Sequence, residues 1–294
     1  MKKTPVIGLT IGDPAGIGPE IIEKALAHFS KRADAPALRI IGSAKGARAG
    51  KPNKTSARQA LAALESSVEL LQRGEICAVV NGPVCKKNLS LIGFPFPGQT
   101  EFYAARAGCA PSQVTMMLTS PRLTVSLVTT HCALRKAIRA LTAKSIVETT
   151  QRTIAALLLM GIRNPKIAVC GLNPHAGEEG LFGDEEQRVI LPAVAALQKE
   201  KRARISGPHA PDTVFLQASR GVFDAVICMY HDQGLIPLKL IGFDSGVNLT
   251  LGLPFWRAAP DHGTAFDIAG KNIASPASLI AAIRLVNRLT RRRI

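Results

Sequence analysis

Residues 224–239, DAVICMYHDQGLIPLK, begin as an apolar segment and change abruptly to histidine, aspartate and glutamine at His231. A short run rich in Val and Ile is typical of a buried strand. The polar residues after it either cap the strand and open a loop, or belong to a ligand site. The rest of the chain decides between these two interpretations.

Five further segments have the same character, and segments of helical periodicity separate several of them. This alternation predicts an α/β fold with mainly parallel strands. Strands are expected at residues 5–10, 38–42, 76–80, 123–129, 166–171 and 224–230.

Three helices have recognisable ends. The helix at 18–29 has Pro19 near its first turn, and the helix at 55–74 has a Thr or Ser cap and ends at a glycine. The helix at 275–290 places Ser275 at its cap and Pro276 at its first position.

Polar segments follow most of the predicted strands. In parallel α/β folds, ligands collect beyond the carboxyl ends of the strands, so we expect these segments to converge on one crevice. They are IGDPAGIGPE (11–20), NGPVCKKN (81–88), TTHCALRKA (129–137), GLNPHAGEEG (171–180) and YHDQGLIPLK (230–239).

The length of 294 residues and the hydrophobic content of 47% suffice for two domains or one large α/β unit. No apolar run approaches the roughly 20 residues that span a bilayer. The first residues meet Gly and Pro before a signal-peptide core develops. These features predict a cytoplasmic protein without a membrane partner.

The net charge of +16 would attract phosphates, carboxylates or nucleic acid. The basic runs are short, dispersed and free of interleaved aromatic residues, which favours a solvated basic surface. A small anionic substrate is compatible with this surface, and nucleic acid is not expected as a partner. A non-enzymatic protein that binds nucleic acid is the remote alternative.

The six cysteines lie far apart without a CxxC pair. This spacing signals neither a zinc knuckle nor a disulfide framework. Reduced thiols, mostly in the core, are expected.

Three of the six histidines, His131, His175 and His231, follow predicted strands and are expected to precede loops. Neutral imidazoles bind Zn²⁺, Ni²⁺, Co²⁺ or Fe²⁺, and three histidines with an open position form a catalytic metal site. The long spacing between them is equally consistent with separate strand caps. His28 is expected on a helix surface, and His209 in a loop beside Asp212.

Specific motifs occur in order along nearly the whole chain. They are IGDPAGIGPE, NGPVCKKNL, FPGQTEFYA, NPHAGEEGLFGDEE, MYHDQGLIPLK, GVNLTLGLPFWR and DHGTAFDIAG. With these motifs the chain resembles the 4-hydroxythreonine-4-phosphate dehydrogenase (PdxA) family of pyridoxal phosphate biosynthesis.

The resemblance implies an isocitrate/isopropylmalate-dehydrogenase-like fold of two α/β/α domains. It also implies a homodimer, with an active site in the interdomain cleft that the partner subunit completes. Residues 1–118 with 249–294 would bind the cofactor, and residues 119–248 would hold substrate and metal and form the dimer.

The resemblance also assigns residues. One divalent metal per site (Zn, Mg, Co or similar) would be bound by His131, His175 and His231. By the resemblance of DHGTAFDIAG to the cofactor loop of these dehydrogenases, NAD or NADP would be held by the loop containing His262, Gly263, Thr264, Ala265 and Asp267. GDPAGIGPE does not have the Rossmann spacing. Substrate contacts are expected from Gln99, Thr100, Lys239, Asn248 and Arg257. Asp212, Asp232 and Lys239 are the candidates for chemical roles, although either aspartate could instead cap a loop.

The implied reaction is oxidation of 4-phosphohydroxy-L-threonine at C3, followed by decarboxylation to 3-amino-2-oxopropyl phosphate. The chain departs from the family at Gln99, where a histidine is usual, and in residues 43–57, a shorter segment than usual. Glutamine cannot carry charge, so an anion contact there would weaken. Relatives acting on 4-phospho-D-threonate, D-erythronate phosphate or a terephthalate-type cis-dihydrodiol supply the alternative substrates.

Overall fold

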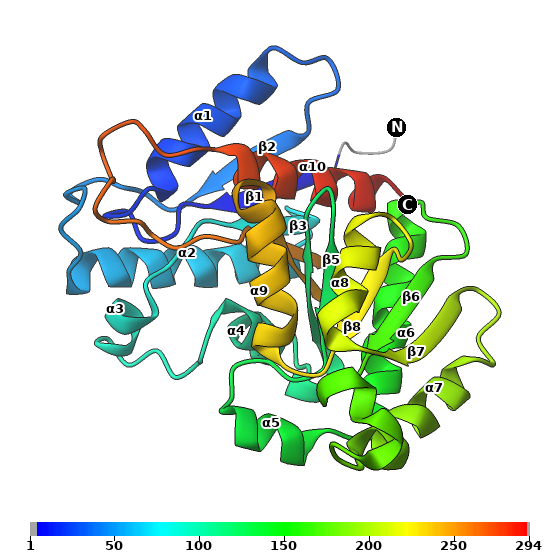
Figure 1. The fold of residues 1–294 in the computed structure, drawn as a ribbon. Helices are drawn as coiled ribbons and strands as arrows, with labels where there is room; N and C mark the ends of the chain where they lie inside the picture. The colour runs from blue at the N-terminus through cyan, green and yellow to red at the C-terminus, as the bar shows by residue number, and fades with distance from the viewer. Residues whose placement is uncertain (1–4, 293–294) are drawn as a thin grey trace. The chain divides into compact units, whose positions relative to one another are not determined.

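A computed structural model describes residues 5–292 (Figure 1). The chain divides into two compact units, Met1–Pro111 with Val247–Ile294, and Ser112–Gly246. The domains expected from the sequence, 1–118 with 249–294 and 119–248, differ from this division mainly at β4 (Thr115–Thr119), which lies in the second unit. The roles assigned to the two domains stay predictions.

The first unit contains five neighbouring strands. Their order is β2 (Ala37–Ile41), β1 (Val6–Thr10), β3 (Ala78–Asn81), β10 (Trp256–Pro260) and β9 (Val247–Leu251). The first four are parallel and β9 is antiparallel to β10. The helices of this unit are α1 (Gly18–Ser30), α2 (Lys54–Gln72), α3 (Lys86–Ser90), α4 (Gln99–Arg106) and α10 (Ala277–Arg292). A short helical turn, η1 (Pro111–Gln113), follows α4 at the boundary between the two units.

The second unit also contains five strands. Their order is β4, β5 (Thr124–Leu127), β8 (Ala225–Cys228), β6 (Lys166–Cys170) and β7 (Arg204–His209), and only the β4–β5 pair is antiparallel. Its helices are α5 (Leu134–Ala140), α6 (Ala143–Met160), α7 (Leu191–Leu197), α8 (Pro211–Ser219) and α9 (His231–Gly242). Short helical turns lie at η2 (Pro174–Gly180), η3 (Glu186–Ile190) and η4 (Phe243–Ser245).

Both faces of the second unit's strands are covered by helices, as a parallel sheet requires. Ile167 and Val169 of β6 join a core with residues of α6 and α7. The alternate residues Ala168 and Cys170 join a second core with residues of α8 and α9, which lie on one side of the strands in Figure 1. Because these strands are buried on both faces, they appear in the sequence as nearly continuous apolar runs.

The predicted α/β class and mainly parallel strands are confirmed. All six predicted strands occur, with ends within two residues of the expected ones, and so do the three predicted helices. The prediction missed β4, β7, β9 and β10. In β7, RISGPH offers few apolar residues, and its burial is only partial.

Three local expectations were wrong. The cap of α2 is Asn53, whose Oδ1 accepts the backbone N–H groups of Thr55 and Ser56. His209 ends β7 instead of lying in a loop. His231 is followed by helix α9, in which Pro237 is accommodated, and not by a loop.

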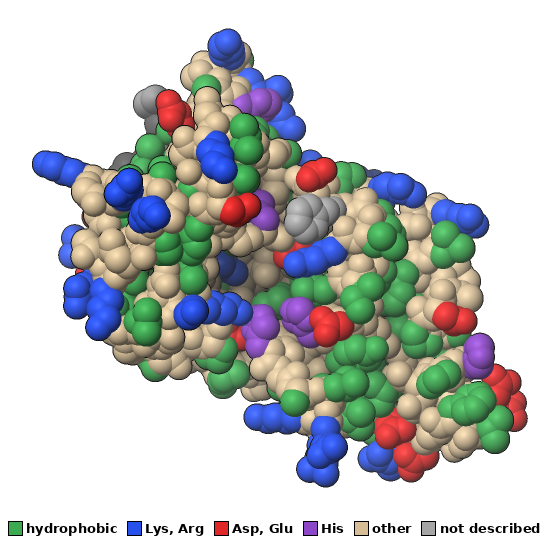
Figure 2. Space-filling model, turned by 60° about the vertical axis from the view of Figure 1, so that its left-hand side comes forward, with side chains coloured by type: hydrophobic (Ala, Val, Ile, Leu, Met, Phe, Trp, Pro, Cys, Tyr) green, Lys and Arg blue, Asp and Glu red, His purple; other side chains and the backbone are tan. Residues whose placement is uncertain are grey.

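The cysteines are all free, but only Cys170 and Cys228 are buried, so the expectation of mostly core thiols was also wrong. Lys and Arg side chains are scattered over the face in Figure 2. Within residues 5–292, no helix has the length and apolar character needed to cross a membrane.

Candidate active site

Two of the predicted metal ligands lie together in the second unit. Strands β5 and β8 are parallel neighbours, so the residues after them emerge at the same edge. The ring centroids of His131 and His231 are 5.5 Å apart. The Nδ1 atom of His231 is 2.8 Å from Oδ1 of Asp232, which orients the ring and directs its Nε2 atom to other partners. Histidine side chains lie beside an acidic side chain on the face shown in Figure 2.

His175 does not join this pair. It follows β6 in the η2 turn, where its ring lies near that of Phe182, with centroids 6.2 Å apart. Among the described residues, no three His, Cys, Asp or Glu side chains form a group that could hold a metal ion. The structure therefore brings together two of the three predicted ligands within one chain.

The turn that carries His175 has an unusual backbone. Residues 175–179 all have positive φ, from 40° to 84°, and only Gly177 among them is a glycine. A left-handed conformation costs roughly 1–2 kcal/mol per non-glycine residue, so surrounding contacts must hold the turn. Glu186 supplies them: its buried carboxylate accepts the backbone N–H groups of Leu172 and Asn173, each at 2.7 Å.

The other candidates of the second unit are exposed. Asp212 lies in the first turn of α8, and Asp232 and Lys239 lie on α9. The last two are seven residues apart, so they share a face of the helix about 10 Å apart along its axis. The chemical role of Asp212 stays a prediction.

In the first unit, Arg257 of β10 is buried, with 3% of its surface exposed. Its Nε donates to Oδ1 of Asn81 at 2.7 Å, and Nη2 donates to Oε1 of Gln99 at 2.9 Å. Nη1 lies 3.4 Å from Oγ1 of Thr100 and 3.3 Å from Oγ1 of Thr250. Three predicted substrate residues, Gln99, Thr100 and Arg257, are thus in direct contact.

All four of these acceptors are uncharged. Burial lowers the pKa of Arg257 to about 10, while Tyr103 and Glu101 act in the opposite direction. The Arg257 guanidinium lies over the Tyr103 ring, 5.8 Å from its centroid. At neutral pH the site therefore holds a desolvated positive charge, which an anion would stabilise.

Asn248, the remaining predicted substrate residue, lies on β9. Its Oδ1 atom is buried and has no hydrogen-bond partner among the described residues. Such an atom normally has a partner, so a ligand that donates a hydrogen bond would satisfy it.

The predicted cofactor loop follows β10 and packs on the β1–α1 loop. Thr264 accepts a hydrogen bond from the backbone N–H of Ile17, 2.9 Å away, and a Cβ atom on Gly16 would lie 2.7 Å from the Thr264 carbonyl oxygen. Ala265 has a φ of 41°.

The loop has features that fit a bound nucleotide. The Nε2 atom of His262 is buried without a partner in the described part of the chain, and the space around the Cα of Gly263 is open. Gly263 would therefore allow close approach of a ligand to the backbone, and His262 could bond to it. Asp267 lies in the same loop, in the turn after Ala265.

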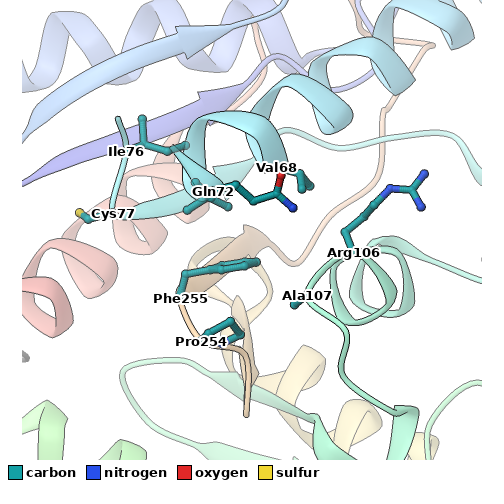
Figure 3. Close-up of a pocket in the computed structure, with 9 residues that line it drawn as sticks. Val68, Gln72, Ile76, Cys77, Arg106, Ala107, Pro254 and Phe255 are labelled. Carbon is teal, nitrogen blue, oxygen red and sulfur yellow. The ribbon is translucent and has the colours of Figure 1, made fainter. Parts of the chain in front are cut away.

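A separate pocket of about 400 Å³ lies elsewhere in the first unit (Figure 3). Its lining includes Val68, Ile76, Cys77 and Phe255, and none of the predicted site residues. Ile76 and Cys77 precede β3, so this pocket is at the amino end of a parallel strand. Ligands of this fold class collect at the other end.

Asn81, Thr250 and Glu186 were not singled out from the sequence. Asn81 stands at a strand end, in a motif that was recognised, but its buried contact with Arg257 joins residues 176 positions apart. Glu186 lies within the recognised NPHAGEEGLFGDEE motif, where nothing distinguishes it from its acidic neighbours.

Comparisons with known proteins agree with this geometry. The model of the family "Pyridoxal phosphate biosynthetic protein PdxA" matches residues 17–286. A 4-hydroxythreonine-4-phosphate dehydrogenase of Bradyrhizobium diazoefficiens is 42% identical, with 96% of each chain covered. A D-threonate 4-phosphate dehydrogenase of Cupriavidus necator is also 42% identical, with 98% of each covered.

Solved structures give the same result. The crystal structure of 4-hydroxythreonine-4-phosphate dehydrogenase from Klebsiella pneumoniae matches with a TM-score of 0.79 and 36% identity, covering 98% of both chains. Isocitrate dehydrogenase from Methylococcus capsulatus shares the fold, with a TM-score of 0.59 and 14% identity over 98% of this chain and 88% of that one.

Proposed function

Because the chain belongs to the family of the pyridoxal phosphate biosynthetic protein PdxA, we propose that it is an NAD(P)-dependent 4-hydroxythreonine-4-phosphate dehydrogenase. The reaction would oxidise the C3 alcohol of 4-phosphohydroxy-L-threonine to a ketone, with release of the hydroxyl proton and with bound NAD(P) as the hydride acceptor. The resulting β-keto acid loses CO₂ and gives 3-amino-2-oxopropyl phosphate. This reaction is one step of pyridoxal phosphate synthesis.

The observation that carries the proposal is the buried Arg257 with its shell of uncharged acceptors. A guanidinium in this state suits a phosphate or carboxylate, which it can bind through charge-assisted hydrogen bonds. Thr100 and Asn248 add a hydroxyl and a buried amide oxygen for the polar groups of the substrate. Lys239 is exposed on α9 and is proposed as a second cation for the same substrate.

His131 and His231 are proposed as ligands of one divalent metal ion, and their separation of 5.5 Å between ring centroids suits two imidazoles on one ion. When bound, such an ion supplies Lewis acidity that eases proton loss from a hydroxyl. Asp232 holds the tautomer of His231 through Nδ1. Zn, Mg and Co are candidates, because ligand type alone does not separate the metals that imidazole binds.

We propose that His175 of a second copy of this chain completes the metal site. Within one chain His175 does not join the other two, although its rigid turn is suited to presenting a side chain outward. Large apolar side chains are exposed in the same unit, including Leu181 at 73% and Phe182 at 46%. Such residues are typical of a surface that another subunit covers, which favours a homodimer.

The cofactor is proposed to lie on the loop from His262 to Asp267. A bound nicotinamide supplies the hydride acceptor for the reaction. Two features of the chain would contribute to binding. The buried Nε2 atom of His262, which has no hydrogen-bond partner among the described residues, could bond to the cofactor, and Gly263 would let the cofactor approach the backbone closely. The choice between NAD and NADP, the cytoplasmic location and the absence of nucleic acid among the partners stay predictions.

A second candidate substrate is 4-phospho-D-threonate, because a D-threonate 4-phosphate dehydrogenase is as similar to the chain as the hydroxythreonine enzymes. Gln99 stands where the family usually has histidine, so the surroundings of the phosphate differ. Both candidates carry the phosphate that Arg257 requires.

The proposal is tested by following NADH and NADPH formation with four substrates. These are 4-phosphohydroxy-L-threonine, 4-phospho-D-threonate, 4-phospho-D-erythronate and a terephthalate-type cis-dihydrodiol. We expect the highest kcat/KM with 4-phosphohydroxy-L-threonine, and a loss of about 10- to 100-fold when the phosphate is removed. Preference for the dihydrodiol, which carries carboxylates and no phosphate, would contradict the assignment of a phosphate to Arg257, and preference for 4-phospho-D-threonate would select the second candidate.

A further inference from the structure

The amide side chain of Asn81 has a fixed orientation in the buried interior of the first unit. Its Oδ1 faces Nε of Arg257, which can only donate. Its Nδ2 donates to Oγ1 of Thr10 at 3.1 Å and to the hydroxyl of Tyr103 at 2.7 Å. Asn81 thus uses its acceptor and both of its donors, and rotation of the amide would break all three contacts.

A directed chain of hydrogen bonds extends from this amide. Because the Tyr103 oxygen accepts from Asn81, its own hydrogen points to Oγ of Ser67, 2.6 Å away. The Ser67 hydroxyl in turn donates to the carbonyl of Leu64. Asn81, Tyr103 and Ser67 are all completely buried, so this chain has no competing water.

Gln99 is anchored in the same manner at the other end of the guanidinium. Its Oε1 accepts from Nη2 of Arg257, and its Nε2 donates to the carbonyl of Gly82 at 3.3 Å. The two amides hold Nε and Nη2, two of the three nitrogens of the group. They fix its plane without contributing any negative charge.

The choice of amides has a consequence for the charge of Arg257. A buried arginine is usually paired with a carboxylate, which compensates its charge within the protein. Aspartate and glutamate have nearly the same shapes as Asn81 and Gln99 and would accept the same hydrogen bonds. The neutral side chains fix the orientation of the cation and leave its charge for an incoming anion.

We infer that Asn81 is a positioning and specificity-determining residue, which fixes the Arg257 guanidinium and, by being uncharged, keeps it available to a phosphate group. Gln99 has the same role at Nη2 and acts through Arg257. This inference rests on the proposed function only in taking a phosphate as the anion.

The test is the nearly isosteric substitution Asn81→Asp. The hydroxyls of Thr10 and Tyr103 can both turn to donate to the new carboxylate, so no buried donor loses its partner. The added charge pairs with Arg257 inside the protein. We expect an unchanged or higher melting temperature together with weaker phosphate binding, a combination that a purely structural residue would not give.

Two measurements are made on wild type and variant. Calorimetric titration with inorganic phosphate should show binding at least about tenfold weaker for Asn81→Asp. Kinetics with the preferred phosphorylated substrate should show KM raised by about 10- to 100-fold while kcat changes by less than about twofold. Gln99→Glu should change both quantities in the same directions, and it serves as the second variant if Asn81→Asp fails to fold.

Gln72→Glu is the matched control, because it makes the same chemical change on an exposed residue of the same unit. It should leave phosphate binding and KM unchanged. Phosphate binding by Asn81→Asp or Gln99→Glu equal to that of wild type would overturn the inference. A wild-type protein that binds phosphate yet oxidises none of the four substrates would refute the proposed function and leave this inference standing.

Discussion

His209 shows how burial makes a single residue sensitive to pH. It is half-buried at the end of β7, its Nε2 lies 2.8 Å from Oγ of Ser206, and its ring packs near Phe223. Burial lowers the pKa of His209 below its ordinary value. The folded protein therefore binds a proton at this site less readily than the unfolded chain does.

The sign of the effect follows from this difference. Above about pH 6.5 the histidine is neutral in both states, and its contribution to stability is fully present. As the pH falls through that value, the unfolded chain takes up the proton first, so stability is lost. The loss ends once the pH is below the lowered pKa of the folded state.

We predict that His209→Gln flattens the pH dependence of the unfolding free energy between about pH 5 and 7. The slope should decrease by at most about 1.4 kcal/mol per pH unit, the limit for one proton. Urea denaturation at several pH values measures it. His28→Gln, at a partly exposed position of α1, is the control, and an identical slope for wild type and His209→Gln would refute the prediction.

At the scale of elements, the η2 turn depends on a carboxylate that lies outside it. Glu186 accepts three hydrogen bonds, from the backbone of Leu172 and Asn173 and from Nδ2 of Asn173. These contacts secure the chain where it leaves β6 for the left-handed residues 175–179. The strained turn persists because its base is fixed in this way.

We predict that Glu186→Ala lowers the unfolding free energy by at least about 2 kcal/mol, because buried N–H groups lose their acceptor. The same variant should weaken metal binding, since His175 would lose its fixed position. Glu186→Gln keeps one acceptor oxygen and should have an intermediate effect. Denaturation curves and metal titration measure the two effects.

Asp184→Ala is the control for this prediction. Asp184 is exposed and forms an ion pair with Arg188 on the surface, and such pairs contribute less than about 1 kcal/mol. If Glu186→Ala were as stable as Asp184→Ala, the turn would be held by other contacts.

At the scale of the whole molecule, the proposed metal site predicts an exchange of residues between subunits. His175→Ala and His231→Ala should each be inactive as homodimers, because every site lacks one ligand. In a mixed dimer, one site would combine His131 and His231 of the His175→Ala chain with His175 of the other chain. The second site would lack two ligands.

We predict that the mixed dimer recovers about half of the wild-type activity, since one of its two sites is intact. Co-expression with two different tags and sequential purification isolates it, and light scattering should give twice the chain mass of 31.2 kDa. Two His175→Ala chains carrying the same tags form the control. No recovery in the mixed dimer would mean that the three histidines act within one chain or not at all.

The sequence by itself determined the α/β class, the main strands and the position of the polar segments at their ends. These features are local, because burial on both faces imposes continuous apolar runs and the end of each strand must be solvated or bound. The motifs also identified the family, and with it most candidate site residues. The residues at 131, 231 and 257 were found in this way before any contact was known.

The tertiary structure alone decided which of these residues meet. Arg257 contacts Asn81 and Gln99, which lie 176 and 158 positions away, and no pattern of neighbouring residues encodes such contacts. His175 lies in a left-handed turn, which the propensities of its own residues do not predict and whose base is bonded to Glu186. Likewise, only the tertiary structure shows that the four side chains that accept hydrogen bonds from Arg257 are all uncharged.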